Sequence, residues 1–387
     1  MSRTPNEQRE YTVRVLERVR DVPREAWDAL ARAGDDDGSP FLEHTWLDGL
    51  EQTGCVGPDS GWMPAHLSLW RGEKLVAAAP SYVKGNSEGE FVFDWGWAEA
   101  AERMGIRYYP KVVLAVPFTP ATGERVIVAP GEDRTEATRL LAAAAREWCA
   151  RFEGSSVHVL FPPEGEARVW EESGYLPREG MQLHWRRDGA TTFDEYLARF
   201  DSKHRNQMKR ELRRVREAGI TVETLAPEGH TREIARAMHR FYSSTVDKHG
   251  PWGRHYLNEQ FFDWLVDHFK DRLAWVVARD AASGKPIGGA FNVAKGKRMY
   301  GRYWGTVSDV PNLHFVLCYY EGIRWAIERG IDVFEGGAGR DEHKRSRGFL
   351  PTMTRSVHWV ADGRMRRALG PWLEHERRRI RSFLTEP

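Results

Sequence analysis

Residues 335–363 read EGGAGRDEHKRSRGFLPTMTRSVHWVADG, and the second half of this stretch has a relative earlier in the chain. Residues 173–189, SGYLPREGMQLHWRRDG, align without a gap on residues 347–363, RGFLPTMTRSVHWVADG. Self-similarity at a fixed offset, here close to half of the 387 residues, indicates related structural units. We therefore predict two tandem domains, 1–189 and 190–387. The matching pairs are Gly174 and Gly348, Leu176 and Leu350, Pro177 and Pro351, His184 and His358, Trp185 and Trp359, Asp188 and Asp362, and Gly189 and Gly363.

The two copies differ just before the shared motif. Arg340–Arg347 is densely charged, whereas the corresponding stretch of the first copy, Pro162–Glu172, is milder. This asymmetry predicts that the second copy carries the chemistry.

Composition narrows the class of protein. The hydrophobic fraction is 41% and the charged fraction 29%, which is ordinary for a globular protein, and the net charge of +1 argues against a protein that coats nucleic acid. Cys55, Cys149 and Cys318 are scattered singly and fit no zinc or redox spacing, so we expect a reducing compartment, the cytoplasm. The N-terminus has no apolar core of a signal peptide, and no apolar run is long enough to span a membrane.

The order of predicted elements in the second copy indicates the fold class. Helices come first, then a three-strand meander over 273–279, 286–293 and 297–304, a helix from Leu313, a strand at 331–334, a loop and a last strand. This order is typical of an α/β domain of the GNAT acyltransferase type, with a mixed sheet flanked by helices.

The second copy opens with a basic helical region over 191–222. Apolar residues at helical spacing mark one face, and positive side chains fill much of the remainder. The excess of one sign favours a phosphate-binding or nucleic-acid-binding face, and the alternative is a solvated helix surface. The candidate binding residues are Lys203, Arg205, Lys209 and Arg213.

Two further segments suggest the wall of a binding cleft. Residues 107–128 combine three prolines with three aromatic residues, and contain the candidates Tyr109, Lys111 and Arg125. The alternative for this segment is a packed, proline-rich loop. The turn HGPWGR, from His249, adds Trp252 as a candidate ligand contact.

Several stretches together resemble the Fem-type aminoacyl transferases and, more closely, the FemAB-like family described as peptidoglycan biosynthesis or recognition proteins. They span most of the chain. The stretches are SPFLEHTWL from Ser39, YYPKVVLAVPFTPATGERV from Tyr108, FDSKHRNQMKRELRRVREAGITV from Phe200, FYSSTVDKHGPWGRHYL from Phe241, YGRYWGTV from Tyr300, LHFVLCYYEGIRWAIERG from Leu313 and EHKRSRGFLP from Glu342.

The resemblance implies two GNAT-like domains with a cleft between them, and transfer of an amino acid from aminoacyl-tRNA onto an amine of a cell-wall precursor. It also implies that Lys344, ahead of Gly348 and Phe349, steadies the reacting carbonyl. The chain departs from the family pattern twice. Val316 stands where family members often have Glu, and the segment from Gly337 to Lys344 is one residue longer, which can shift Lys344 or recruit Asp341.

Acyl transfer to an amine needs a neutral amine, a stabilised oxyanion and aligned substrates. Lys344, Arg347 or Arg345 can supply positive charge to the oxyanion or to a phosphate, and Glu342, Asp341 or His343 can accept the amine proton. His314 lies at a predicted helix N-terminus, where the helix dipole favours a neutral base, and the alternative is a buried structural histidine. Arg302 and Tyr303, on a predicted strand, are candidate substrate contacts.

The possible functions differ in the acyl donor that the protein would use. Enzymes that use acyl-CoA hold its pyrophosphate in a glycine-rich loop, but the corresponding residues 305–312 contain one glycine, one Asp and one Pro. We therefore predict an aminoacyl-tRNA donor, no tightly bound cofactor, and an amine of a cell-wall precursor or other small molecule as acceptor. The alternatives are a CoA-dependent N-acetyltransferase and a non-catalytic protein that recognises a ligand in the same cleft. No metal-ligand spacing is found.

Overall fold

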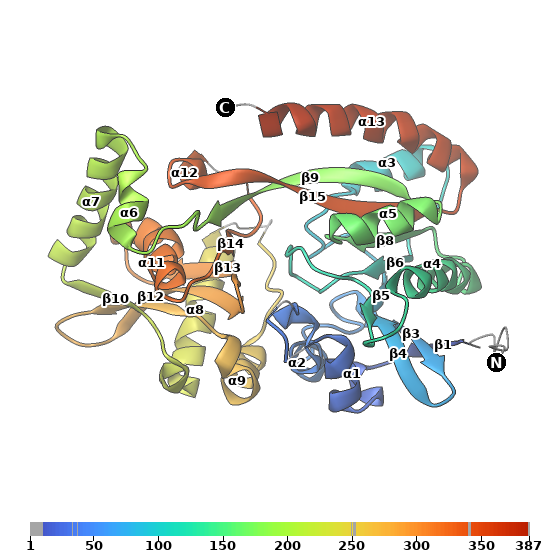
Figure 1. Cartoon of the computed structure of the whole chain (residues 1–387), viewed down its shortest axis with the longest axis horizontal. Coiled ribbons are helices and arrows are strands. Elements are labelled where there is room, and N and C mark those ends of the chain that lie inside the picture. The colour runs from blue at the N-terminus through green and yellow to red at the C-terminus, as the bar shows by residue number, and fades with distance from the viewer. Residues whose placement is uncertain are drawn as a thin grey trace, which may run out of the picture.

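The computed structural model describes residues 11–32, 34–36, 38–248, 250, 253–339 and 342–385. Two α/β lobes lie side by side along the long axis of the molecule (Figure 1). One mixed sheet runs through both lobes in the order β10-β11-β12-β13-β14-β9-β15-β8-β6-β5-β2, and a smaller sheet, β1-β3-β4-β7, belongs to the first lobe. The predicted α/β class, with a mixed sheet flanked by helices, is confirmed.

The first lobe is formed by the N-terminal part of the chain. Its helices are α1 (Arg24–Leu30), α2 (His44–Gln52), α3 (Trp95–Arg103), α4 (Arg134–Arg151) and α5 (Glu164–Glu172). Its strands are β1 (Thr12–Leu16), β2 (Trp62–Pro64), β3 (His66–Arg71), β4 (Lys74–Ala79), β5 (Ser81–Lys84), β6 (Lys111–Leu114), β7 (Ile127–Val128) and β8 (Ser156–Leu160).

The second lobe contains the predicted three-strand meander, which is confirmed as β11 (Val276–Asp280), β12 (Pro286–Lys295) and β13 (Arg298–Thr306). The predicted basic helical region is split in two, because the Asp201 side chain accepts the amide of His204 and starts a new helix there. The remaining elements are α6 (Phe193–Ala198), α7 (Ser202–Glu217), β10 (Ile220–Thr224), α8 (Arg232–Lys248), α9 (Glu259–His268), α10 (Leu313–Phe315), α11 (Glu321–Glu328), β14 (Val333–Glu335) and α12 (Glu342–Arg345).

The repeated motif forms the two long strands that join the lobes, β9 (Leu176–Arg186) and β15 (Phe349–Val360). They pair antiparallel, and Gly180 lies opposite Thr354, its equivalent in the repeat. Equivalent residues therefore face each other at the centre of the ladder, which places a local two-fold axis there. A Cβ on Gly180 would lie 2.7 Å from the Thr354 hydroxyl oxygen, so the crossing of the two copies needs a glycine at this point.

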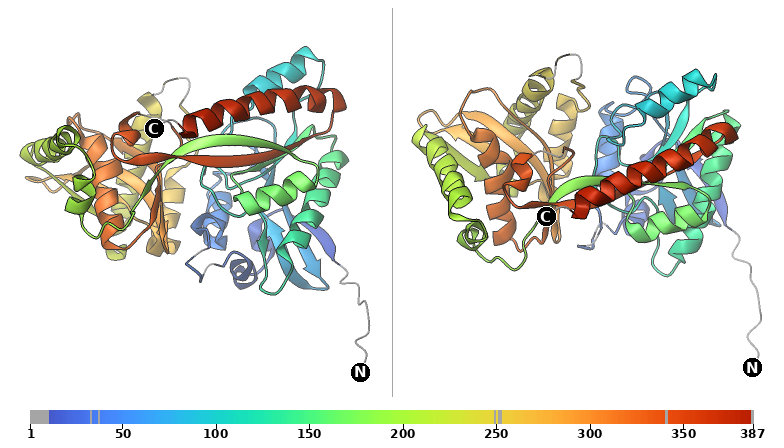
Figure 2. Two further views of the ribbon diagram at one scale, coloured as in Figure 1. Left: turned by 45° about the horizontal axis from the view of Figure 1, so that its top comes forward. Right: turned by 90° about the horizontal axis from the view of Figure 1, so that it is seen from above.

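The C-terminal segment returns to the first lobe. The end of β15 pairs with β8, and α13 (Gly363–Thr385) lies across β9 and β15 (Figure 2). In the other direction, the end of β9 pairs with β14 of the second lobe. Each half of the chain thus contributes a strand to the other lobe. The domain boundary predicted at Gly189 stays a prediction.

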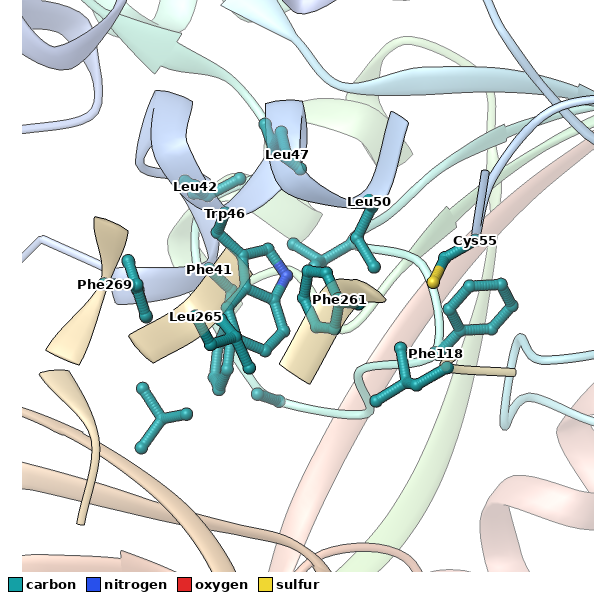
Figure 3. Packing of buried hydrophobic residues seen from close by; sticks show 14 of the residues in the cluster. Phe41, Leu42, Trp46, Leu47, Leu50, Cys55, Phe118, Phe261, Leu265 and Phe269 are labelled. Atoms are coloured by element: carbon teal, nitrogen blue, oxygen red, sulfur yellow. The ribbon is translucent and has the colours of Figure 1, made fainter. Parts of the chain in front are cut away.

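The lobes share an apolar core. Trp46 of α2 packs against Phe261 and Phe269 from the second lobe, with ring centres 5.2 and 5.4 Å apart. Figure 3 shows these rings with Leu47 and Leu50 of α2 beside them. Because burial of large aromatic surfaces is the main stabilising term in protein interiors, this contact holds the two lobes in a fixed relation.

Candidate functional site

The site lies where two parallel strands separate. The pairing of β13 with β14 ends at Tyr300 and Glu335. Beyond this point β13 continues beside β12, whereas the segment that follows β14 turns away at Gly336 and Gly337. A cavity of about 550 Å³ occupies the opening. Its walls include Phe91 and Pro120 of the first lobe and, from the second, Tyr242, Thr245, Val246, Gly253, Arg254, Tyr256, Ala290, Asn292, Gly301, Arg302, Tyr303, Trp304, His314, Cys318, Tyr319, Phe334, Gly336, Gly337, Ala338 and Lys344.

Lys344, the residue singled out in the sequence, is on the wall of this cavity. Its side chain extends from α12, and its Nζ donates to the carbonyl oxygens of Gly337 (3.3 Å), Ala338 (3.1 Å) and Gly339 (3.2 Å). The residue is only 4% exposed. Three carbonyl dipoles therefore hold a buried positive charge beside the cavity.

His314 faces Lys344's cavity from the helical segment that follows β13. Its ring packs on Trp304, with centres 4.3 Å apart, and lies 5.4 Å from the Tyr319 ring. The helix here widens to a π-helical turn over Val316–Tyr320 before α11 continues it. Such turns are frequent at functional sites, and this one belongs to the same segment as the lining residues Cys318 and Tyr319.

Arg302 and Tyr303 also line the cavity, and both connect it to the first lobe. The Tyr303 hydroxyl donates to the carbonyl oxygen of Phe118 at 3.2 Å, and the Arg302 guanidinium donates to the same oxygen. Burial lowers the pKa of Arg302. The proline-rich segment thus reaches the cavity lining through Pro120, and the Phe118 carbonyl holds two of the lining residues, rather than through the predicted Tyr109, Lys111 and Arg125.

The predicted residues of the first lobe, Tyr109, Lys111 and Arg125, form hydrogen bonds within that lobe, and none is in the cavity lining. Lys111 is fully buried and donates to Ser87, Glu90 and Asp94, and the Tyr109 hydroxyl is 2.8 Å from that of Ser87. Arg125 donates to backbone carbonyl oxygens, and burial lowers its pKa to about 10.

The other polar residues of the Lys344 segment point elsewhere. Glu342 and His343 are exposed on α12, and the His343 ring lies 5.2 Å from Phe315. Arg347 is buried and donates to Glu211 at 2.8 Å and to the Tyr320 hydroxyl at 2.9 Å. The structure therefore brings Lys344, His314, Arg302 and Tyr303 together in the cavity lining, whereas Glu342, His343 and Arg347 are not part of that lining.

The basic helix α7 lies at the outer edge of the second lobe (Figure 1). Lys203, Lys209 and Arg213 are exposed, as expected of a binding face, and Arg205 is partly buried and donates to the carbonyl of Phe200. Trp252, the remaining candidate, lies outside the described residues.

Comparison with known proteins agrees with this architecture. The model of the FemAB-like family, described as peptidoglycan biosynthesis/recognition, matches residues 18–386. The chain belongs to the FemAB-like family. Among curated proteins, none matches the sequence.

Solved structures share the fold of this FemAB-like chain at low sequence identity. The crystal structure of FemX is 13% identical, with a TM-score of 0.54 over 90% of this chain and 98% of FemX. The C-terminal domain of a putative lysylphosphatidylglycerol synthetase from Agrobacterium fabrum is 12% identical, with a TM-score of 0.55 over 90% of this chain and 96% of that domain. L-PGS from Bacillus licheniformis is 11% identical, with a TM-score of 0.51 over 84% and 91%.

Sequence reasoning about this FemAB-like chain missed part of the site. Asn292 is a cavity residue at an irregularity in the β12–β13 pairing, and its position inside the apolar strand sequence GGAFNVA was an available signal. Tyr242 and Tyr256 come from helical and loop segments whose periodicity indicates only packing. Both lie in the stretch FYSSTVDKHGPWGRHYL, which carries the family resemblance, but neither was singled out as a candidate.

Glu335 was also missed as a titratable group. It directly precedes Gly336 of the cavity wall, accepts the amide of Thr122 at 3.3 Å and pairs with Arg298 at 3.1 Å. Burial raises the pKa of its carboxyl group to about 7. Among the residues the structure describes, no group of His, Cys, Asp or Glu side chains is arranged to hold a metal ion.

Proposed function

We propose that the protein is an N-acyltransferase that moves an aminoacyl group from aminoacyl-tRNA to an amine of a cell-wall precursor or another small acceptor. The observation that carries this proposal is the buried Lys344 ammonium on the wall of the cavity between β13 and β14. In such a reaction, the amine attacks the ester carbon, a tetrahedral oxyanion forms, and the ribose hydroxyl leaves. A fixed positive charge in a water-poor site stabilises that oxyanion.

The remaining lining suits the other needs of the reaction. Aromatic rings, including Tyr242, Trp304 and Tyr319, form much of the wall. The positive charges in the lining, Lys344 and Arg302, disfavour a second cation beside them and so favour the neutral, attacking form of the amine. The imidazole of His314, on the same wall, is the candidate acceptor for the amine proton.

The loop after β13 favours a donor other than acyl-CoA. The one glycine of residues 305–312, Gly305, lies near the end of β13 and is needed for packing, since a Cβ there would lie 1.7 Å from the carbonyl oxygen of Phe241. Pro311 has no amide hydrogen, and most of the other amides are already used, which leaves little of the loop to bind a pyrophosphate. The amides that donate within the protein are those of Val307, Ser308, Val310 and Leu313.

The basic face of α7 supports a polyanionic donor. Exposed Lys209 and Arg213 lie on the helix whose inner residue Glu211 pairs with Arg347, three residues beyond Lys344. A buried ion pair therefore joins the helix that would bind the phosphates to the segment that carries Lys344. The family description, peptidoglycan biosynthesis/recognition, supports a cell-wall precursor as acceptor.

A binding comparison tests the donor. Charged tRNA and acetyl-CoA are titrated at two salt concentrations against wild type, Lys209→Ala with Arg213→Ala, and a control with two arginines of α13 replaced, Arg367→Ala with Arg378→Ala. We expect salt-sensitive tRNA binding that weakens in the α7 variant and changes less in the control, with no binding of acetyl-CoA.

Two other results would contradict the proposal and favour a different function. Tight acetyl-CoA binding that is indifferent to the α7 substitutions would favour a CoA-dependent N-acetyltransferase. Binding of neither donor would favour a non-catalytic protein that recognises a ligand in the cavity.

A further inference from the structure

A cluster of exposed aromatic rings lies beside the N-terminal end of α3. Phe93 and Trp95 each expose 57% of their surface and stack on one another, with ring centres 4.9 Å apart. Trp372 of α13 exposes 44%. Arg178 joins the two parts, because it donates to the carbonyl of Phe93 at 2.9 Å and lies 5.4 Å from the centre of the Trp372 ring. Large exposed rings gathered in one place indicate a contact surface.

The helices beneath these rings are firmly packed. α13 lies across the long strands β9 and β15, and α3 lies beside the N-terminal half of α13 (Figures 1 and 2). Trp97 and Ala101 of α3 share a buried cluster with Met365, Leu369 and Leu373 of α13. The rings are therefore presented by a fixed platform. We call Phe93, Trp95, Trp372 and the arginines of α13 the α3–α13 surface.

This surface is strongly positive. α13 contains seven Arg and two Glu, a net charge of +5, and α3 contains one Arg and two Glu, a net charge of −1. The whole chain has a net charge of only +1. Positive charge is thus concentrated on α13, and part of it is balanced by Asp362, which pairs with Arg364, and by Glu179, which pairs with Arg381. The exposed arginines of α13 are Arg364, Arg367, Arg378, Arg379 and Arg381.

The other basic helix provides an internal comparison. α7 also carries seven Lys or Arg and two Glu, so its net charge is the same +5. None of the large exposed hydrophobic side chains of the described residues lies on α7, however. A purely basic face suits a hydrated polyanion, whereas basic residues mixed with Trp and Phe suit the headgroup region of an anionic bilayer.

We propose that the α3–α13 surface docks the protein onto a membrane that contains anionic phospholipid. Phe93, Trp95 and Trp372 enter the headgroup region, and the α13 arginines bind lipid phosphates. The contact is peripheral, since none of the described helices is both long enough and apolar enough to cross a bilayer.

The α3–α13 surface lies close to the Lys344 cavity. A second cavity, of about 320 Å³, has Phe93, Arg178 and Arg379 in its wall and shares Phe91 and Ala338 with the Lys344 cavity. The two cavities are therefore neighbours, and the outer one borders the α3–α13 surface. If the proposed transferase function holds, an acceptor anchored in the membrane would approach the Lys344 cavity from this side.

Vesicle flotation of the full chain, without tRNA or acceptor, tests the docking separately from the transferase function. Vesicles of phosphatidylcholine alone are compared with mixed vesicles of phosphatidylcholine and phosphatidylglycerol, at low and high salt. The variants are Phe93→Ser with Trp95→Ser, and Arg367→Gln with Arg378→Gln. The control is Lys209→Gln with Arg213→Gln, which removes the same charge from α7.

We expect wild type to float only with the mixed vesicles, and less at high salt. Each lost arginine should weaken binding about fivefold, the aromatic variant should also bind weakly, and the α7 control should bind like wild type. Equal binding to both vesicle types, no binding at low salt, or an equal loss in the α7 control would overturn the proposal. So would self-association of wild type that the aromatic substitutions abolish, because the surface would then bind a second copy of the chain.

Discussion

Arg347 and Glu211 form a buried ion pair, 2.8 Å from Nη2 to Oε2, that ties the Lys344 segment to the basic helix α7. The Arg347 guanidinium also donates to the carbonyl of His343, directly before Lys344, and lies 3.7 Å from the centre of the Phe315 ring. The pair therefore fixes the position of α12 relative to both α7 and the helical segment that carries His314.

Replacing one member of the Arg347–Glu211 pair should lower the stability of the fold. Glu211→Ala leaves the arginine buried without its carboxylate, and we expect a loss of about 3 kcal/mol in the free energy of unfolding, measured with urea. Arg347→Ala should cost a similar amount, and the double variant less than the sum. Removal of the exposed pair Arg213–Glu217 by Arg213→Ala should change stability by less than about 0.5 kcal/mol. Additive losses in the double variant would show that the two side chains do not depend on each other.

Lys344→Met tests the charge on the cavity wall. The substitution keeps a long side chain and removes the ammonium, so we expect the transfer rate to fall about 100-fold or more. The fold should survive, with a stability cost of about 1 kcal/mol for the lost hydrogen bonds. Lys297→Met is the matched control, because the Lys297 Nζ also donates to a backbone carbonyl, that of Gly330, at an exposed turn. A rate unchanged by Lys344→Met would remove this residue from the mechanism.

Gly305→Ala tests the close approach of α8 to β13. The new Cβ would lie 1.7 Å from the carbonyl oxygen of Phe241, so the helix has to move, and we expect a loss of about 1–3 kcal/mol. Gly165→Ala in α5 is the control, since nothing lies within 4 Å of its Cβ position, and it should be neutral or slightly stabilising. Thermal unfolding of both variants measures the difference. Unchanged stability of Gly305→Ala would mean that this glycine is free for another role, such as phosphate binding.

A buried histidine pair predicts acid sensitivity. His158 and His358 lie opposite each other on β8 and β15, with their Nδ1 atoms 2.7 Å apart. Burial lowers the pKa of His158 to about 3, and that of His358 also falls well below its usual value. In the unfolded chain the two imidazoles bind protons near pH 6.5, whereas in the folded chain they stay neutral there. The free energy of unfolding is therefore at its full value above that pH and decreases as the pH falls below it.

Urea unfolding at several pH values measures this effect. Between about pH 6 and 4 the pair should contribute a slope of about 2–3 kcal/mol per pH unit. The variant His158→Asn with His358→Asn should have a correspondingly shallower dependence. An unaltered slope in the double variant would show that the pair is already protonated in the fold.

The tandem architecture was accessible from sequence because the two copies share a backbone requirement. Gly174 and Gly348, which precede β9 and β15, both adopt left-handed φ values, 88° and 76°. A glycine followed by an aromatic residue, Leu and Pro is therefore a local signal that survives in both copies. The exchange of β15 into the first lobe left no such signal, because periodicity specifies which residues face inward but not which strand lies alongside.

The candidate site was predictable to the extent that it depends on local sequence. Lys344 follows a glycine-rich turn, and that turn is what its ammonium binds. Lys111 and Arg125 have the composition of ligand contacts, but their burial in internal networks depends on distant partners such as Glu90 and Leu160. The sequence shows charge, and only the fold shows whether that charge faces a cavity.

The most direct measurement of the central claim is a transfer assay with both donors. Total tRNA charged with labelled amino acids and labelled acetyl-CoA are offered in parallel to wild type and Lys344→Met, with an amine-bearing peptidoglycan precursor peptide as acceptor. The account predicts label on the peptide from tRNA alone, and a large loss of that label with Lys344→Met. Label from acetyl-CoA alone, or equal transfer by the two proteins, would contradict it.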